Sequence, residues 1–110
     1  MLKFVGKDIY VNAGDDIELN VTVKCDGVPW ALAQGDRLEL CVYSLNDGDT
    51  QFEQTLKERE TTFHIEGKHT KGLSRLPLAY KVSLLFANGK KETIIGRSPT
   101  NIPRFFVLEG

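Results

Sequence analysis

The chain has little of what defines several large protein classes. Among its 110 residues there are only two cysteines and two histidines. A disulfide framework requires more cysteines, and with so few of these residues we expect no structural zinc site of Cys/His type. No apolar run approaches the roughly 18 residues that a membrane-spanning helix needs. With no linker, internal repeat or low-complexity segment either, the sequence predicts one globular domain over residues 1–110.

A secretion signal is also missing, because residues 1–8 contain no apolar stretch of the required length. This predicts a cytoplasmic chain or a piece excised from a longer protein. An excess of charge of either sign is absent: 14 basic and 15 acidic residues leave a net charge of −1. A chain with this balance is not drawn to nucleic acid or to an anionic membrane by charge. We therefore expect neither of these partners.

Apolar residues recur with a period of two. In residues 16–25 five apolar residues alternate with polar ones, which is typical of a half-buried strand. Residues 37–45 and 79–87 show the same pattern, and the second face of 79–87 is also half apolar, which predicts a central strand. These patterns predict a core that contains Ile17, Leu19, Val21, Val23, Leu38, Leu40, Val42, Tyr80, Val82, Leu84 and Phe86.

Weaker strands are predicted over 7–12, 50–57, 61–66, 90–96 and 103–108. Asn88-Gly89 predicts a hairpin with a type I′ turn, in which both central residues have positive φ. Residues 67–78 lack alternation and leave room for a single turn of helix. Strands this short with turns this frequent predict an all-β fold, an immunoglobulin-like antiparallel β-sandwich of seven to eight strands.

The residues whose side chains could take part in catalysis, metal binding or disulfide formation are predicted to have structural roles. Tyr80, at the start of a late strand, is either a tyrosine corner or a plain core residue. Cys25 and Cys41 fall on strand faces that do not both point into the core, which predicts two free thiols. His64 alternates outward, and Asp47 and Asp49 suit a turn better than a calcium loop. We therefore predict no enzyme: no catalytic residue, no cofactor and no metal site.

A set of motifs spans nearly the whole chain. It comprises Ala13-Gly14-Asp15-Asp16 before an alternating strand, Asp26-Gly27-Val28-Pro29 followed by Leu32, the strand from Arg37 to Tyr43, Leu76 before Tyr80, Asn88-Gly89, and a last strand from Arg104 to Leu108. In these features the chain resembles the N-terminal β-sandwich domain of tailed-phage baseplate and tail structural proteins. The resemblance implies a non-enzymatic assembly module that acts through protein–protein contacts and is located in a virion.

The last strand carries the predicted partner interface. Phe105, Phe106, Val107 and Leu108 are four consecutive apolar residues in a strand that we expect at an exposed edge of its sheet, and only one of their two faces can enter the core. We expect the other face to be covered by the N-terminal segment, a second copy of the chain or another protein. Trp30 is the remaining interface candidate, because tryptophan is enriched at interface hot spots; a core position is its alternative.

A carbohydrate-binding or adhesion module is the alternative function. It requires a groove lined by exposed aromatic residues, for which Tyr10, Trp30, Tyr43 and Phe105 are the candidates. No three of them share a predicted strand face.

Overall fold

The computed structural model describes residues 3–5, 8–25, 28–29, 31–73, 77–96 and 102–108, with the backbone alone for 3–5, 24–25 and 28–29. These residues form eleven strands and one helix. Their bounds are β1 Lys3–Val5, β2 Asp8–Asn12, β3 Ile17–Asn20, β4 Lys24–Cys25, β5 Val28–Pro29, β6 Arg37–Ser44, β7 Thr50–Thr55, β8 Thr62–Ile65, α1 Gly67–Gly72, β9 Leu78–Leu85, β10 Lys91–Ile95 and β11 Arg104–Leu108.

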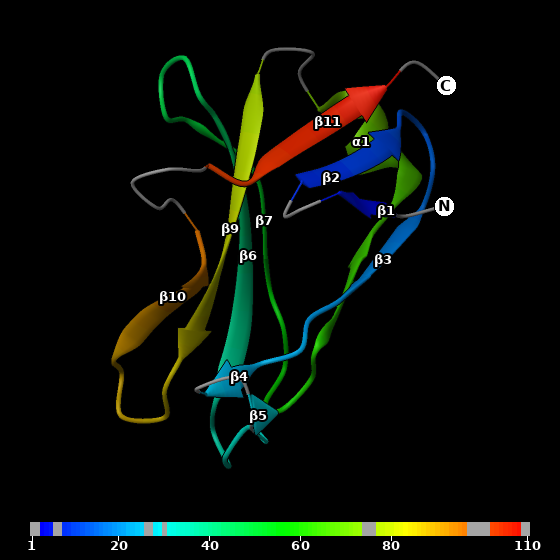
Figure 1. Ribbon diagram of the computed structural model, residues 1–110. Coiled ribbons are helices and arrows are strands. Elements are labelled where there is room, and N and C mark those ends of the chain that lie inside the picture. The colour runs from blue at the N-terminus through cyan, green and yellow to red at the C-terminus, as the bar shows by residue number, and fades with distance from the viewer. Residues whose placement is uncertain are drawn as a thin grey trace.

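Seven of the strands form one large sheet in the order β1-β2-β11-β9-β6-β7, and β10 pairs with the same edge of β9 that β11 reaches further along. Strands β3 and β8 form a separate antiparallel pair, and β4 pairs with β5. Figure 1 shows β3 and β8 as a layer apart from β6 and β9, with β2 and β11 crossing near the upper end. The fold is therefore all-β and has two layers.

The hydrophobic core lies between these layers. The large sheet contributes the inward residues of β2, β6, β9 and β11, and the β3–β8 pair contributes the opposite wall. The largest fully buried side chains are Tyr80, Phe63, Phe105, Ile9, Leu19, Leu38, Leu40, Ile65, Leu78, Leu84, Val42 and Val82. One continuous cluster joins them, so both layers share one core.

The alternation predicted for residues 16–25 is confirmed as far as Val23, whereas in β6 and β9 residues of the second face such as Cys41 and Ser83 are buried as well. Ile17, Leu19, Val21 and Val23 are buried while Glu18, Asn20 and Thr22 between them are exposed. Ten of the eleven predicted core residues are buried. The exception is Phe86, which lies just beyond β9 and is only half-buried against the rim of the core. The predicted central position of β9 is also confirmed, because it lies between β6 and β11.

Three expectations about the strands are wrong in detail. The count exceeds seven to eight because the predicted strand 16–25 is divided into β3 and β4 and because short β1 and β5 were not expected. The sheet is not purely antiparallel, since β2 and β11 pair in parallel. The hairpin at Asn88-Gly89 is confirmed, but its turn is not type I′, because Gly89 has positive φ (88°) and Asn88 does not. Phe86 N donates to Lys90 O, so the loop is longer than two residues.

Helix α1 supplies the single helical turn for which residues 67–78 left room. The buried hydroxyl of Thr70 accepts a hydrogen bond from Gly14 N at 3.0 Å and lies 2.9 Å from Asp15 O and 3.0 Å from Gly67 O. Gly67 packs directly on Gly14 O, where a Cβ atom would collide. The helix is thus fastened to the turn that precedes β3. No helix among the described residues is long and apolar enough to cross a membrane.

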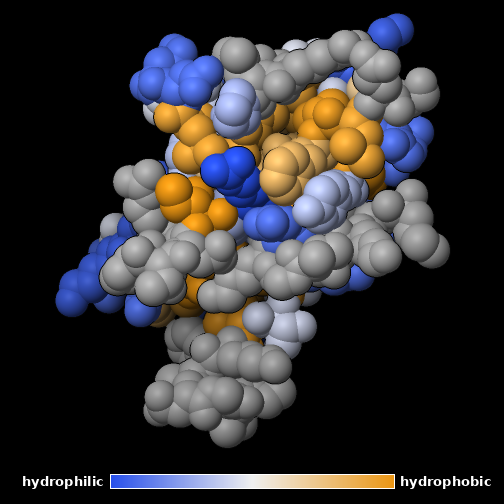
Figure 2. Space-filling model, turned by 45° about the horizontal axis from the view of Figure 1, so that its top comes forward, coloured by the Kyte–Doolittle hydropathy of each residue, from blue (hydrophilic) through white to orange (hydrophobic). Residues whose placement is uncertain are grey.

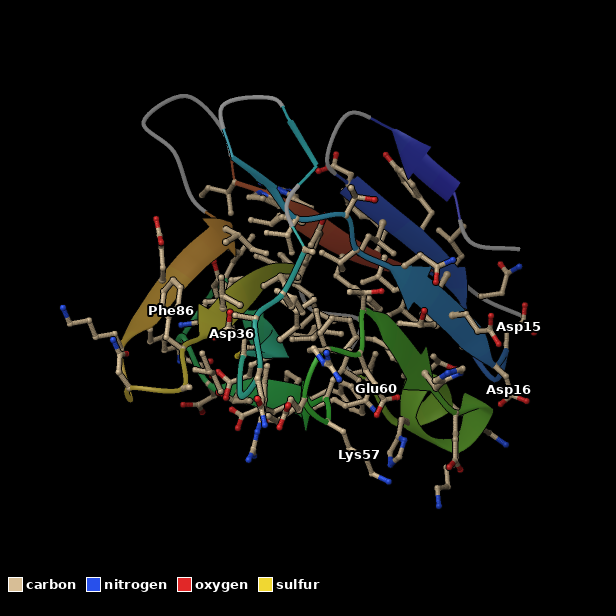
Figure 3. The ribbon with its side chains drawn as sticks, turned by 90° about the horizontal axis from the view of Figure 1, so that it is seen from below. Asp15, Asp16, Asp36, Lys57, Glu60 and Phe86 are labelled. Atoms are coloured by element: carbon tan, nitrogen blue, oxygen red, sulfur yellow. The ribbon has the colours of Figure 1, made fainter. Side chains whose placement is uncertain are left out.

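A buried carboxylate organises the opposite end of the molecule. Asp36 is only 4% exposed, and its oxygens accept hydrogen bonds from Ala33 N at 3.0 Å and Ala87 N at 3.4 Å. Its main-chain oxygen accepts from Arg59 N at 2.9 Å. Figure 3 shows Asp36 beside Phe86, far from Asp15 and Asp16. Asp36 therefore connects three loops that are distant in sequence.

Candidate interaction surface

The candidate surface is built on the parallel pair of β2 and β11. Phe105 is opposite Ile9, and Phe106 is opposite Tyr10. Since successive side chains of a strand point to opposite faces, Ile9 and Phe105 share the core face and Tyr10 and Phe106 share the outer face. The sheet holds this register firmly, because Arg104 N also donates to Asp8 Oδ1 at 3.0 Å and Ala13 N to Leu108 O at 2.8 Å.

The four predicted interface residues divide between the two faces. Phe105 is 1% exposed and belongs to the core, and Val107 is half-buried and packs against it. Phe106 is half-buried, and Leu108 is 48% exposed, the one large hydrophobic residue so exposed in the part of the chain described. Only Phe106 and Leu108 are therefore placed where a partner can reach them.

The expectation that the C-terminal strand is an exposed sheet edge is wrong. β11 lies inside the large sheet, between β2 and β9, and β1 and β7 end the sheet order instead. The N-terminal segment expected as one cover comprises Leu2, Phe4 and Val5, whose side chains lie outside the described part of the chain. The strand that lies alongside β11 is β2. The ring of Tyr10 on β2 stacks on Phe106, with centroids 4.8 Å apart and an interplanar angle of 13°.

We define the outer-face patch as Tyr10, Phe106 and Leu108. The half-buried Asp8 and the exposed Arg104 lie beside it on the same faces of the same two strands. Figure 2, which brings the upper end of Figure 1 forward, shows hydrophobic side chains gathered at that end with hydrophilic ones among them. The patch is thus apolar at its centre and carries both signs of charge at its border.

The aromatic residues considered for carbohydrate binding are not brought into one groove. Phe105 is in the core, Tyr10 is stacked in the outer-face patch, and Tyr43 lies on β6, beyond β11 and β9 in the sheet order. Trp30 lies outside the described residues. The sequence indicates Tyr10 only as a candidate for sugar binding, because no local sequence pattern predicts its pairing with Phe106.

The side chains considered for catalysis or metal binding lie as follows. His64 is exposed and its Nδ1 is 3.6 Å from Glu18 Oε1. Asp47 Oδ1 accepts from Asp49 N at 2.9 Å, which is a turn contact. Within the described ranges no group of three or more His, Cys, Asp or Glu side chains is placed to hold a metal ion. Cys41 is a buried free thiol, and the side chain of Cys25 lies outside the described part.

Tyr80 is the one described tyrosine in the core. Burial, followed by the nearby carboxylate of Asp8, raises its pKa from 10.0 to about 12. Its main-chain N–H donates to Pro103 O at 3.1 Å, at the entry to β11. Such burial suits a structural residue that anchors the crossing of β9 and β11.

Comparisons with protein-family models, with curated proteins and with solved structures found no match to this chain.

Proposed function

We propose that the protein is a non-enzymatic assembly module whose outer-face patch contacts a second copy of the chain. The observation that carries this proposal is the stacked pair of Tyr10 and Phe106 with Leu108 exposed beside it. Exposed apolar clusters bordered by polar residues commonly mark protein–protein contacts. Aromatic residues also dominate the energetic centres of such contacts.

The border of the patch favours a second copy as the partner. Asp8 and Arg104 carry opposite charges and flank the same apolar centre. In a two-fold contact the same surface meets itself, so Arg104 of each copy can approach Asp8 of the other. A net charge of −1 adds little repulsion between copies.

The sequence resemblance supports the wider context of this proposal. We place the module among tailed-phage baseplate and tail structural domains, with an immunoglobulin-like sandwich as its architecture and a virion as its location. The two layers around one core are compatible with that architecture. A carbohydrate-binding or adhesion function is less well supported, because its aromatic candidates are dispersed over the core and the outer face.

Light scattering on the purified chain, over micromolar concentrations, tests the self-association. The wild type is expected to exceed the monomer mass, and Phe106→Lys to remain folded with the monomer mass. Phe105→Lys places a charge in the core and is expected to unfold the chain. Gln51→Lys, on the exposed part of β7, is the control that adds a charge elsewhere and should leave the mass unchanged.

Two outcomes contradict the proposal. One is a wild type that stays monomeric at every concentration, which leaves the patch for a different protein at most. The other is a Phe106→Lys variant that is folded and associates as the wild type does, which means that association uses another surface.

A further inference from the structure

A hollow of about 560 Å³ lies on the outer face of the large sheet, away from the outer-face patch. Its floor is formed by Cys41 and Tyr43 of β6 and by Lys81 of β9. Its walls come from the turn between β6 and β7, through Gly48, and from β10, through Thr93. Figure 1 shows that turn and β10 on the same side of β9. Small-molecule sites usually fall between roughly 300 and 1,000 Å³.

Lys81 is a half-buried cation on this floor, and no residue of the described ranges forms an ion pair with it. The nearest acidic neighbour on β6, Glu39, is already occupied. Its Oε1 is 2.9 Å from Lys91 Nζ, and its Oε2 accepts from Thr55 Oγ1 at 3.4 Å. No Asp or Glu is among the described residues that line the hollow. Glu53 of β7 is the cross-strand partner of Cys41 on the side of β6 away from Lys81, and it is not among the lining residues. A ligand with a negative charge would therefore meet the Lys81 cation with no carboxylate in the described lining.

Two threonine side chains line the same hollow as this cation. Thr50 lines the hollow, with its Oγ1 3.7 Å from Cys41 Sγ, and Thr93 lines it from the other side. Ser83 shares a strand face with Lys81 and is the cross-strand partner of Thr93. Its buried Oγ has no hydrogen-bond partner among the described residues. Ser83 is not among the described residues that line the hollow, so the threonine hydroxyl groups of Thr50 and Thr93 are the ones available to a ligand.

We propose that this hollow binds a small organic anion that carries both a carboxylate and hydroxyl groups, the chemistry of a sugar acid. The carboxylate pairs with Lys81, and the ligand hydroxyls bond to Thr50 and Thr93. The ring of Tyr43 supplies an apolar face for the C–H groups of the sugar. The site uses β6, β7, β9 and β10, so it is separate from the self-association proposed above.

Titration of the ¹⁵N-labelled chain with D-glucuronate, followed by its amide spectrum, tests the proposal. Saturable shifts are expected at the amides of residues 41, 43, 50, 81 and 93. Glucose lacks the carboxylate and acetate lacks the hydroxyls, so each is expected to bind at least roughly tenfold more weakly. Because Phe106→Lys alters only the outer-face patch, it should bind glucuronate as the wild type does.

Two variants locate the interaction. Lys81→Met keeps the length of the side chain and should weaken glucuronate binding by roughly tenfold or more. Lys90→Met removes an exposed lysine from the turn before β10 and should have no effect. The proposal is overturned if glucuronate causes no shifts around the hollow, if Lys81→Met binds as well as Lys90→Met, or if acetate binds as tightly as glucuronate.

Discussion

The side-chain amide of Gln54 pairs with both main-chain groups of His64. Its Nε2 donates to His64 O at 3.1 Å, and its Oε1 accepts from His64 N at 3.1 Å. β7 is the last strand of the large sheet, and β8 belongs to the other layer. The side chain of Gln54 therefore replaces main-chain hydrogen bonds between β7 and β8, and it links the two layers.

Removal of this amide should separate the two edges. Gln54→Ala leaves the N–H and the C=O of His64 to water, and the free energy of unfolding should fall by about 1–2 kcal/mol. Gln54→Glu keeps an acceptor for His64 N but places a carboxylate oxygen opposite the acceptor His64 O, so a loss at least as large as that of Gln54→Ala is expected. Urea denaturation measures both, with the exposed Gln51→Ala as control. Equal stability of Gln54→Ala and Gln51→Ala would show that the pairing contributes nothing.

The two main-chain N–H groups that donate to the side chain of Asp36 require an acceptor oxygen each. Asn at this position offers one oxygen, and its NH₂ group faces either Ala33 N or Ala87 N, both of which are donors. Asp36→Asn should therefore lower the free energy of unfolding by about 1–3 kcal/mol. Asp47→Asn is the matched control, because Asp47 uses one oxygen in an exposed turn and Asn can replace it. If both variants lower the free energy of unfolding by the same amount, the buried contacts of Asp36 stabilise the fold no more than the exposed turn contact of Asp47 does.

Burial along a strand could be predicted from the sequence, whereas contacts between distant parts of the chain could not. Burial of Leu38, Leu40 and Val42 follows from alternation along one strand, and the core of the large sheet was predictable for that reason. The stack of Tyr10 on Phe106 depends on a parallel pairing between the two ends of the chain, which no local pattern encodes.

The same limit applies to the polar contacts. Asp36 and Ala87 are 51 residues apart, and Thr70 and Gly14 are 56 apart. Neither pair has a recognisable sequence spacing, because the contact forms only when the tertiary fold brings the two residues together. Alternation therefore divides the four apolar residues of β11 between two faces, but the position of this strand inside the sheet, between β2 and β9, was not predictable from the sequence.

Tyr80 should make stability fall at alkaline pH. Its pKa is raised to about 12 in the folded chain against 10.0 for an ordinary tyrosine, so the folded state holds the proton more tightly than the unfolded state. Its contribution is complete below about pH 10 and disappears as the pH rises towards about 12, a change of up to about 2–3 kcal/mol. Urea denaturation across this range should show a smaller fall for Tyr80→Phe than for the wild type.

The matched control is Tyr43→Phe, on the outer face of β6, which should keep the fall of the wild type. At neutral pH, a tyrosine corner predicts a further loss of about 1 kcal/mol for Tyr80→Phe. An alkaline fall that is the same in all three proteins would mean that burial of Tyr80 does not control it. If Tyr80→Phe leaves the denaturation midpoint and slope at neutral pH unchanged, Tyr80 does not form a tyrosine corner.

Thr70 should be required for the docking of α1. Its hydroxyl is fully buried, accepts a hydrogen bond from Gly14 N and donates one to Asp15 O. Thr70→Val keeps the shape but leaves these groups without a partner, so the free energy of unfolding should fall by about 1–3 kcal/mol. Thr70→Ser retains the hydroxyl and should lose less, only the contacts of one methyl group. Amide exchange locates the effect: the Gly14 amide should exchange faster in Thr70→Val than in Thr70→Ser. Equal protection of Gly14 in the two variants would show that the hydroxyl does not hold the helix to this turn.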